Sequence, residues 1–178
     1  MTPYAQGERW TLYKGDALAI LPHLPRVDNI TTDPPYSSGG FTRGDRTGTT
    51  TSKYLSSGSR QAESLPQFAG DNRDQRGYLM WSALWMGAAL DLAEPGAVLA
   101  CFTDWRQWTP TTDAMQAGGW VWRGVVTWIK PATRPQKGRF AAGSEFIVWG
   151  SAGPMPDGGE CHPGHWIGQA PHDREHVT

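Results

Sequence analysis

The sequence alternates between segments with the two-residue period of strands and segments with the period of about 3.6 residues that is typical of helices. Strands are expected at 10–15, 27–33, 97–102, 121–130 and 144–153. Helices are expected within 17–25, from Gln75 to Leu92, and before the Gly118-Gly119 pair. Such alternation favours an α/β fold with a mostly parallel sheet that helices cover on both faces.

The remaining segments are rich in glycine, proline and polar residues, which predicts connections rather than regular elements. A Glu94-Pro95-Gly96 turn is expected between the helix from Gln75 to Leu92 and the strand at 97–102. Residues 37–76 are predicted to form one long, flexible loop, and 151–178 an irregular tail. The 178 residues, of which 38% are hydrophobic, suffice for a single domain with its own core.

Charge and composition exclude several classes of protein. The formal net charge of -1 gives no overall basic field, although twelve of the sixteen cations are arginine. No stretch approaches the ~20 apolar residues of a membrane span, and no signal sequence is expected, because the segment "MTPYAQGERW" has no apolar region. Cys101 and Cys161 are far apart, and the histidines of the tail are irregularly spaced, so no metal site is expected. A cytoplasmic protein fits this composition best.

Three aspartates follow predicted strands: Asp16, Asp33 and Asp104. In open α/β sheets, ligands bind outside the carboxyl ends of parallel strands. The three carboxylates are therefore expected to lie along one edge of the sheet. For Asp16, a second interpretation is equally open, since an aspartate at this place can cap the following helix.

The sequence Asp33-Pro34-Pro35-Tyr36 combines a carboxylate, rigid carbonyl groups and an aromatic ring. Each proline fixes its own φ and removes its own N–H, so the turn presents hydrogen-bond acceptors in a fixed arrangement. An exocyclic amino group on a planar base needs acceptors for its two N–H groups and a ring that stacks on the heterocycle. Asp33, Pro34, Pro35 and Tyr36 are the candidate catalytic residues.

The order of several segments resembles the DNA methyltransferases that modify adenine N6 or cytosine N4. These segments are "LYKGDALAILPHLP", "DPPY", "LAEPGAVLACFTDW", "VVTWIKPATRPQKGRF" and "SEFIVWGSAG", and they match members in which the catalytic motif precedes the cofactor motif. The resemblance implies a Rossmann-like fold, S-adenosylmethionine as cofactor and DNA as partner. It also implies that Asp16 and Asp33 face the cofactor, together with Thr178 at the end of the segment "REHVT".

The sequence departs from the family pattern in one respect. Family members carry a Phe-x-Gly-x-Gly turn for the cofactor beyond the segment that resembles "REHVT", and neither FxGxG nor GxGxxG occurs in this chain. The central strand that bears this turn is therefore expected to be absent from residues 1–178. The chain would be a fragment, would rely on a second polypeptide, or would be a relative that binds without methylating.

Basic residues in two of the expected loops are candidates for contacts with DNA phosphates. The six named for this role are Arg43, Arg46, Lys130, Arg134, Lys137 and Arg139. A solvated charged loop is the alternative for each of them. An aspartate as the first motif residue favours adenine N6 over cytosine N4. A non-catalytic DNA-binding module, an N4-cytosine enzyme and an N-methyltransferase with another substrate stay open.

Four other interpretations concern side chains near these segments. Cys101 is expected to be a core thiol without a nucleophilic role, because the run "AVLACF" is apolar. Trp81 and Trp85, four residues apart, are expected in the core or against the sheet. Trp105 and Trp108 are candidates for a pocket wall, although a packing role is the stronger expectation. Glu145 is expected to have a structural role.

Overall fold

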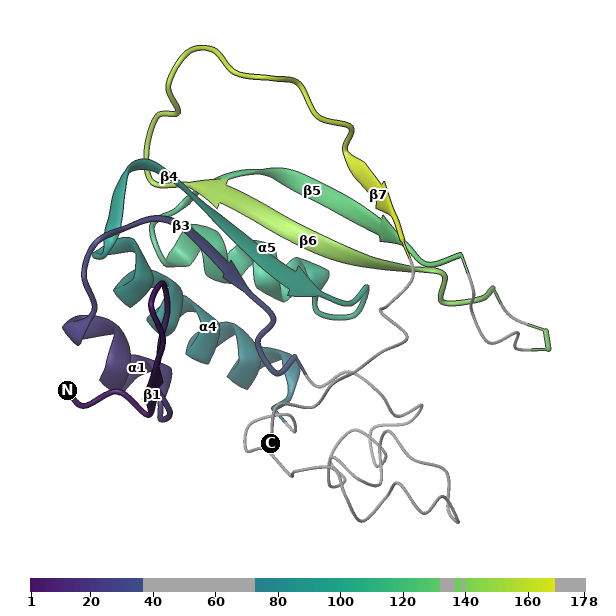
Figure 1. Cartoon of the computed structure of the whole chain (residues 1–178). Coiled ribbons are helices and arrows are strands. Elements are labelled where there is room, and N and C mark those ends of the chain that lie inside the picture. Colours follow the sequence, from purple (N-terminus) through teal and green to yellow (C-terminus); the bar gives the residue numbers. More distant parts are fainter. Residues whose placement is uncertain (37–72, 132–136, 139, 169–178) are drawn as a thin grey trace.

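The computed structural model describes residues 1–36, 73–131, 137–138 and 140–168. Its main feature is a five-stranded sheet in the order β3-β4-β6-β5-β7 (Figure 1). The strands are β3 (Val27–Thr32), β4 (Ala93–Thr103), β5 (Val121–Ile129), β6 (Ser144–Ser151) and β7 (His165–Ile167). The expected α/β fold is confirmed, and the central strands β4, β6 and β5 lie close to the positions that the period of the sequence predicted.

The sheet is mixed, so the expectation of a mostly parallel sheet is wrong. β3 is parallel to β4, and β5 is parallel to β7, whereas β6 is antiparallel to both of its neighbours. β6 follows β5 in the chain and enters the sheet between β4 and β5. The carboxyl ends of β3, β4 and β5 therefore share one edge with the beginning of β6, which we call the catalytic edge.

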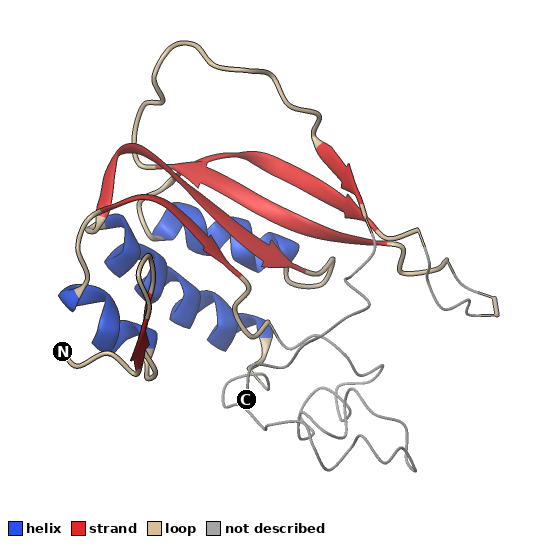
Figure 2. Cartoon of the chain, viewed as in Figure 1, coloured by secondary structure: helices blue, strands red, loops and turns tan. Residues whose placement is uncertain are grey.

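Two helices pack against one face of the sheet, α4 (Gln75–Leu90) and α5 (Trp108–Ala117) (Figures 1 and 2). A short helix, α1 (Ala17–Ile20), and a 3₁₀ turn, η1 (Leu21–His23), pack on α4. In the part of the chain that the structure describes, no helix covers the opposite face. Coverage of both faces, which the alternation predicted, is therefore not seen within these residues.

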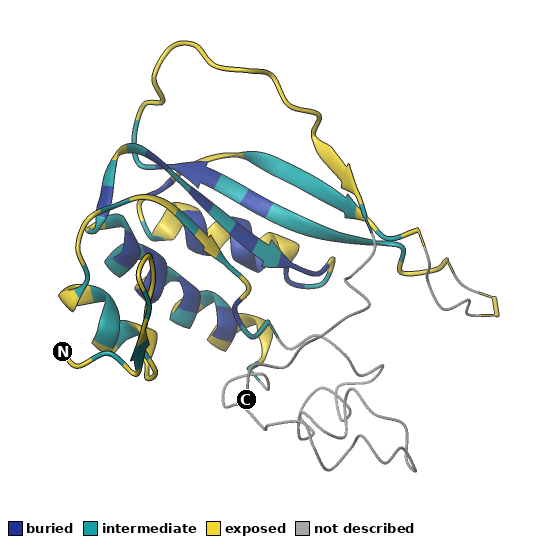
Figure 3. Ribbon diagram, in the orientation of Figure 1, coloured by how far each residue is buried: buried dark blue, intermediate teal, exposed yellow. Residues whose placement is uncertain are grey.

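The core lies between these helices and the sheet, as the dark blue segments of Figure 3 show. Its buried side chains come from α4, β4, α5 and β6, and include Met86, Leu99, Met115 and Val148. Gly118 ends α5, and a Cβ there would lie 2.9 Å from the Cβ of Met86 and 3.0 Å from the amide nitrogen of Gly87. The two helices can approach this closely only because Gly118 has no side chain.

β4 contains the Glu94-Pro95-Gly96 segment that the sequence predicted as a turn before the strand. Val27 lies opposite Ala93, and Asn29 lies opposite Val98, so the residues between them bulge out of the β3–β4 ladder. Gly96 has a φ of +83°, which glycine adopts readily. The turn chemistry was recognised correctly, but it forms a bulge inside a strand and does not precede one.

The two ends of the described chain also differ from expectation. The predicted strand at 10–15 shrinks to β2 (Thr11–Leu12), which forms a separate hairpin with β1 (Ala5–Gln6). The tail, predicted to be irregular, contributes β7, whose three residues lie opposite Thr127–Ile129 of β5. Strands of two or three residues are too short to show a period in the sequence. The predicted 37–76 loop overlaps the start of α4 at Gln75, and 37–72 lie outside the described residues.

Leu99→Ala should lower the free energy of unfolding by about 2–5 kcal/mol, because Leu99 is fully buried between β4 and the helices. Leu84→Ala is the matched control, since Leu84 on α4 is 59% exposed. Urea denaturation followed by circular dichroism measures both. Equal effects of the two substitutions would contradict the assigned core.

Candidate functional site

β3 ends at Thr32, and the Asp33-Pro34-Pro35-Tyr36 turn follows directly at the catalytic edge. Pro34 is buried, Pro35 and Tyr36 are half-buried, and Asp33 is exposed. The two prolines stop the strand and hold the turn in an extended form, because the residue before a proline avoids the helical region. The carboxylate thus stands at the surface while the turn behind it is anchored in the protein.

A cavity of about 710 Å³ adjoins this turn. Its wall is formed by Ile30 and Asp33 of the β3 segment, by Asp16 before α1, and by Trp81 and Trp85 of α4. Pro34 and Pro35 also line it. The structure therefore brings Asp16 and Asp33 to one cavity.

Asp16 reaches this cavity in an unexpected way. It does not follow a strand of the main sheet, because the preceding β2 belongs to the separate hairpin. Its Oδ1 accepts a hydrogen bond from the Leu18 amide at 2.9 Å and so caps α1. The capping interpretation is confirmed, and the predicted position on the edge of the sheet is wrong. Thr178 lies outside the described residues.

Asp104 follows β4 at the catalytic edge, as predicted, but its carboxylate is engaged in the turn before α5. Oδ1 accepts hydrogen bonds from the amides of Arg106 and Gln107, at 2.9 and 3.0 Å. Oδ2 forms an ion pair with the Arg106 guanidinium at 2.8 Å. Asp104 is thus a structural residue of this turn.

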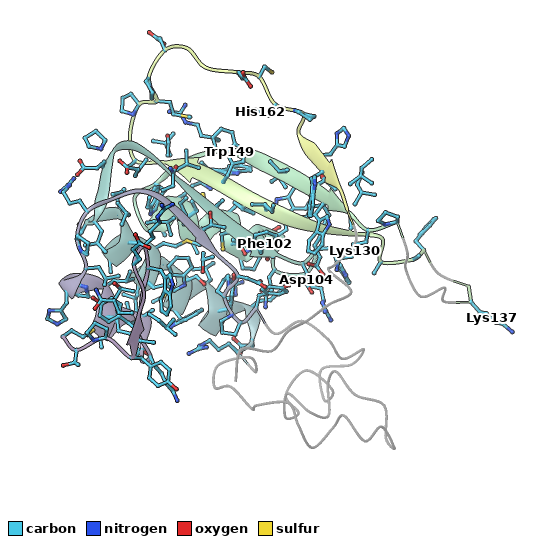
Figure 4. All side chains as sticks on the ribbon, viewed as in Figure 1. Phe102, Asp104, Lys130, Lys137, Trp149 and His162 are labelled. Carbon is cyan, nitrogen blue, oxygen red and sulfur yellow. The ribbon has the colours of Figure 1, made fainter. Side chains whose placement is uncertain are left out.

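Partial burial of Asp33 raises the pKa of its carboxyl group, and the Glu145 carboxylate raises that pKa further. The Lys130 ammonium opposes this increase. Lys130, directly after β5, forms an ion pair with Glu145 at the start of β6, and its amide donates to the Gly143 carbonyl at 2.8 Å. Figure 4 shows Lys130 at the same end of the sheet as Asp104.

The sequence did not predict this ion pair, although a separate role was expected for each of the two residues. Lys130 was assigned to DNA phosphates, and in the structure its ammonium is paired with a carboxylate. Glu145 has the structural role expected of it and also acts on the charge of Asp33. The register that places Ile129 opposite Ser144 brings the two side chains together. Recognising 121–151 as a β-hairpin would have revealed the pair.

Two aromatic residues of α4 form part of the cavity wall. Trp85 is 5% exposed and belongs to the core, as expected. Its indole Nε1 is buried and has no hydrogen-bond partner among the described residues. Trp81 is half-buried, and the Arg73 guanidinium lies 4.3 Å from its ring centre. Trp81 is therefore a wall residue as well as a packing residue.

Cys101 is fully buried, which confirms the expected core thiol. Burial raises the pKa of this thiol, and the Asp33 carboxylate raises it further. A thiol of this kind stays protonated at neutral pH and is a poor nucleophile.

Few of the predicted DNA contacts can be located. Arg43, Arg46, Arg134 and Arg139 lie outside the described residues. Lys137 is exposed and projects from the connection between β5 and β6 (Figure 4). The described residues contain no group of three or more potential metal-ligating side chains. None of their helices has the length and apolar content needed to cross a membrane.

Glu145→Gln should lower the pKa of Asp33, because it removes a negative charge and leaves the Lys130 charge unopposed. Lys130→Met should raise the same pKa. Glu94→Gln is the control, since Glu94 is paired with Arg26 and is not among the groups that shift Asp33. Carbon-13 NMR titration of the Asp33 carboxyl group measures all three. A pKa that Glu145→Gln left unchanged would contradict the assigned electrostatics.

Comparison with known proteins places this geometry in a family. The sequence matches the N6/N4 family described as DNA methylase over residues 27–163. No curated protein sequence matches the chain. Among solved structures, the fold is similar to M1.HpyAVI, with a TM-score of 0.56 at 16% identity, covering 91% of this chain and 68% of that one.

Two further structures share the fold. The M1.HpyAVI-SAM complex gives a TM-score of 0.53 at 16% identity, covering 89% of this chain and 66% of the other. The PvuII DNA methyltransferase, described as cytosine-N4-specific, gives 0.59 at 13% identity, covering 93% and 59%. This chain therefore spans about two thirds of the length of M1.HpyAVI. The family match covers well over half of the sequence, and the chain belongs to the N6/N4 DNA methylase family.

Proposed function

We propose that the protein is a DNA methyltransferase that transfers a methyl group from S-adenosylmethionine to the exocyclic amino group of a base turned out of the helix. The observation that carries this proposal is the cavity that joins Asp33, Pro34 and Pro35 to Asp16, in a chain of the N6/N4 DNA methylase family. The target base would enter from the catalytic edge, where the Asp33 carboxylate is exposed.

Asp33 and the turn behind it supply the chemistry that an amino group requires. The carboxylate and the Pro34 carbonyl accept hydrogen bonds from the two N–H groups, which draws the nitrogen lone pair out of conjugation with the ring. Tyr36 stacks on the base and fixes its plane. The Asp33 carboxylate also accepts the proton that the nitrogen loses, and its raised pKa favours that step. No covalent bond between enzyme and base is needed.

The cavity fits S-adenosylmethionine in size and in chemistry. Its volume of about 710 Å³ lies within the range of about 300–1,000 Å³ that small-molecule sites occupy. Asp16 and Asp33 offer carboxylates to a ligand that carries hydroxyl, ammonium and sulfonium groups. Ile30, Trp81 and Trp85 give an apolar wall. The cofactor, when bound, supplies the electrophilic methyl group.

We further propose that the glycine-rich turn of the cofactor site comes from outside residues 1–178, because the sequence contains neither FxGxG nor GxGxxG. A second polypeptide is one source of that turn. The same absence favours the second candidate function, a DNA-binding module that retains the base pocket and does not methylate.

Adenine N6 is the proposed target, since the motif begins with Asp33. The similarity to the PvuII enzyme, described as cytosine-N4-specific, concerns the fold and does not favour either base. Mass spectrometry of nucleosides from treated DNA separates N6-methyladenine from N4-methylcytosine.

Asp33→Ala should reduce methyl transfer at least about 10²-fold, the loss typical when a preorganised polar group is removed from a reacting centre. DNA binding should persist. Transfer of tritium from labelled cofactor to DNA measures the rate, in the protein together with any polypeptide needed for activity. Asp113→Ala, on the exposed face of α5, is the control and should be active. A near-normal rate for Asp33→Ala would refute the assigned role.

Residues 1–178 alone should bind S-adenosylmethionine no more tightly than about the millimolar range, because the glycine-rich turn that would complete the cofactor site is not among them. Isothermal titration calorimetry on the purified chain tests this expectation. A one-to-one heat with a micromolar Kd would show that the chain builds the whole cofactor site by itself.

A further inference from the structure

Trp105 occupies an unusual position in the turn between β4 and α5. Its side chain is 68% exposed, whereas the neighbouring Asp104 and Gln107 are only 8% and 5% exposed. The turn therefore buries its polar residues and exposes its largest apolar one. This is the reverse of the usual distribution of residues between interior and surface.

Hydrogen bonds within the turn hold Trp105 in place. The Asp104 carboxylate binds the amides of Arg106 and Gln107, and the Gln75 side chain at the start of α4 donates to the Arg106 carbonyl at 2.8 Å. The exposed indole therefore belongs to a turn whose backbone is hydrogen-bonded to Asp104 at the end of β4 and to Gln75 at the start of α4.

A buried hydroxyl network supports the same turn from below. Thr111 of α5 donates to the Gln107 carbonyl at 2.7 Å, and its hydroxyl also contacts those of Thr103 and Tyr78 at 3.1 Å each. These contacts join β4, α4 and α5 beneath the turn. The backbone that carries Trp105 therefore has little freedom to move the indole into the core.

Trp105 lies at the catalytic edge. β3 and β4 are adjacent parallel strands, with Thr32 opposite Cys101, so Asp33 and the β4–α5 turn both follow the carboxyl ends of neighbouring strands. Adjacent strands are about 4.8 Å apart. Figure 4 shows Asp104, the residue before Trp105, at this end of the sheet.

A second tryptophan, the first residue of α5, extends this surface. Trp108 is 37% exposed, and its ring lies 4.7 Å from that of Phe146 with an angle of 31° between the planes. The Arg106 guanidinium lies 5.7 Å from the Trp105 ring. One exposed apolar side chain is ordinary, but Trp105 and Trp108 expose two indoles within four residues at the edge that also carries Asp33, which gives a surface suited to stacking on planar bases.

We propose that Trp105 stacks on a nucleobase of the DNA next to the position from which the target base is extruded. This inference rests on the proposed function and adds a residue to it. Turning a base out of a duplex leaves neighbouring base faces without a stacking partner, and an indole held at the carboxyl ends of β3 and β4 replaces the lost contact. Indole is suited to this role because every base has a flat face, whatever the sequence.

The test compares Trp105→Ala with Trp122→Ala in binding to a fluorescein-labelled oligonucleotide, measured by anisotropy. Trp122 is a matched control, since it is 43% exposed and lies near the start of β5, at the opposite edge of the sheet. Trp105→Ala should weaken the affinity for duplex DNA with one mismatched base pair, from which a base is easily extruded, about 5- to 150-fold, the range that base–aromatic stacking spans. Trp122→Ala should change it less than twofold, and Trp105→Phe should retain most of the affinity.

Unchanged affinity in Trp105→Ala, or an equal loss in both alanine variants, would overturn the proposal. A failure of Trp105→Phe to bind better than Trp105→Ala would do the same, because phenylalanine still stacks. These outcomes differ from failure of the proposed function. A protein that binds DNA with the expected dependence on Trp105 but never methylates it would refute catalysis and leave the stacking role standing. A protein without affinity for DNA would refute both.

Discussion

Five residue pairs join β3 to β4 in parallel, and the last of them sets Thr32 opposite Cys101. In the described part of the chain β3 lies at the edge of the sheet, so β4 alone holds it in register. Cys101 and Leu99 of β4 are fully buried beneath α4 and α5. The position of Asp33 therefore depends on a core that lies one strand away. A one-residue slip in this register would turn the side chains of β3 to the other face of the sheet.

The acidic residues at the catalytic edge differ in the groups that their carboxylates contact. Asp104 is held by the Arg106 guanidinium and by two backbone amides, and Glu145 is held by Lys130. Both stabilise the ends of strands. Asp33 instead begins a turn whose two prolines lack backbone N–H groups, so they cannot donate hydrogen bonds to its carboxylate. Its carboxylate is consequently available at the surface, and its pKa is governed by burial and by the Glu145–Lys130 pair.

The sequence predicted the parts of this fold whose signals are local and long enough to show a period. α4, β5 and β6 lie where the pattern placed them, and Asp33-Pro34-Pro35-Tyr36 ends a strand at the edge of the sheet. β1 and β7 escaped prediction because strands of two or three residues are too short to show a period, and β7 in addition pairs with β5, which lies far from it in the sequence. The mixed sheet was missed because strand direction is a tertiary property that no single segment records.

The sequence predicted those residues of the candidate site that belong to one short motif. It did not predict the contacts that depend on which strands pair and in which register. Asp16 lines the cavity as the cap of a helix and not at a strand end, which agrees with the second interpretation of the sequence, and its contact with a cofactor stays a prediction. The Lys130–Glu145 pair unites residues fifteen positions apart, and only the β5–β6 register brings them into contact. The exposure of Trp105 likewise follows from hydrogen bonds that bury its neighbours.

Because β6 is antiparallel to β5, the connection between them begins and ends at the same edge of the sheet. That connection leaves the sheet at Ile129 and returns at Ser144, two residues that lie opposite each other at the catalytic edge. Its ends are therefore fixed by the ladder, while its length and composition are independent of the core. Substitutions and changes of length between these two residues are therefore expected to leave the pairing of β5 with β6 and the packing beneath the sheet unaltered.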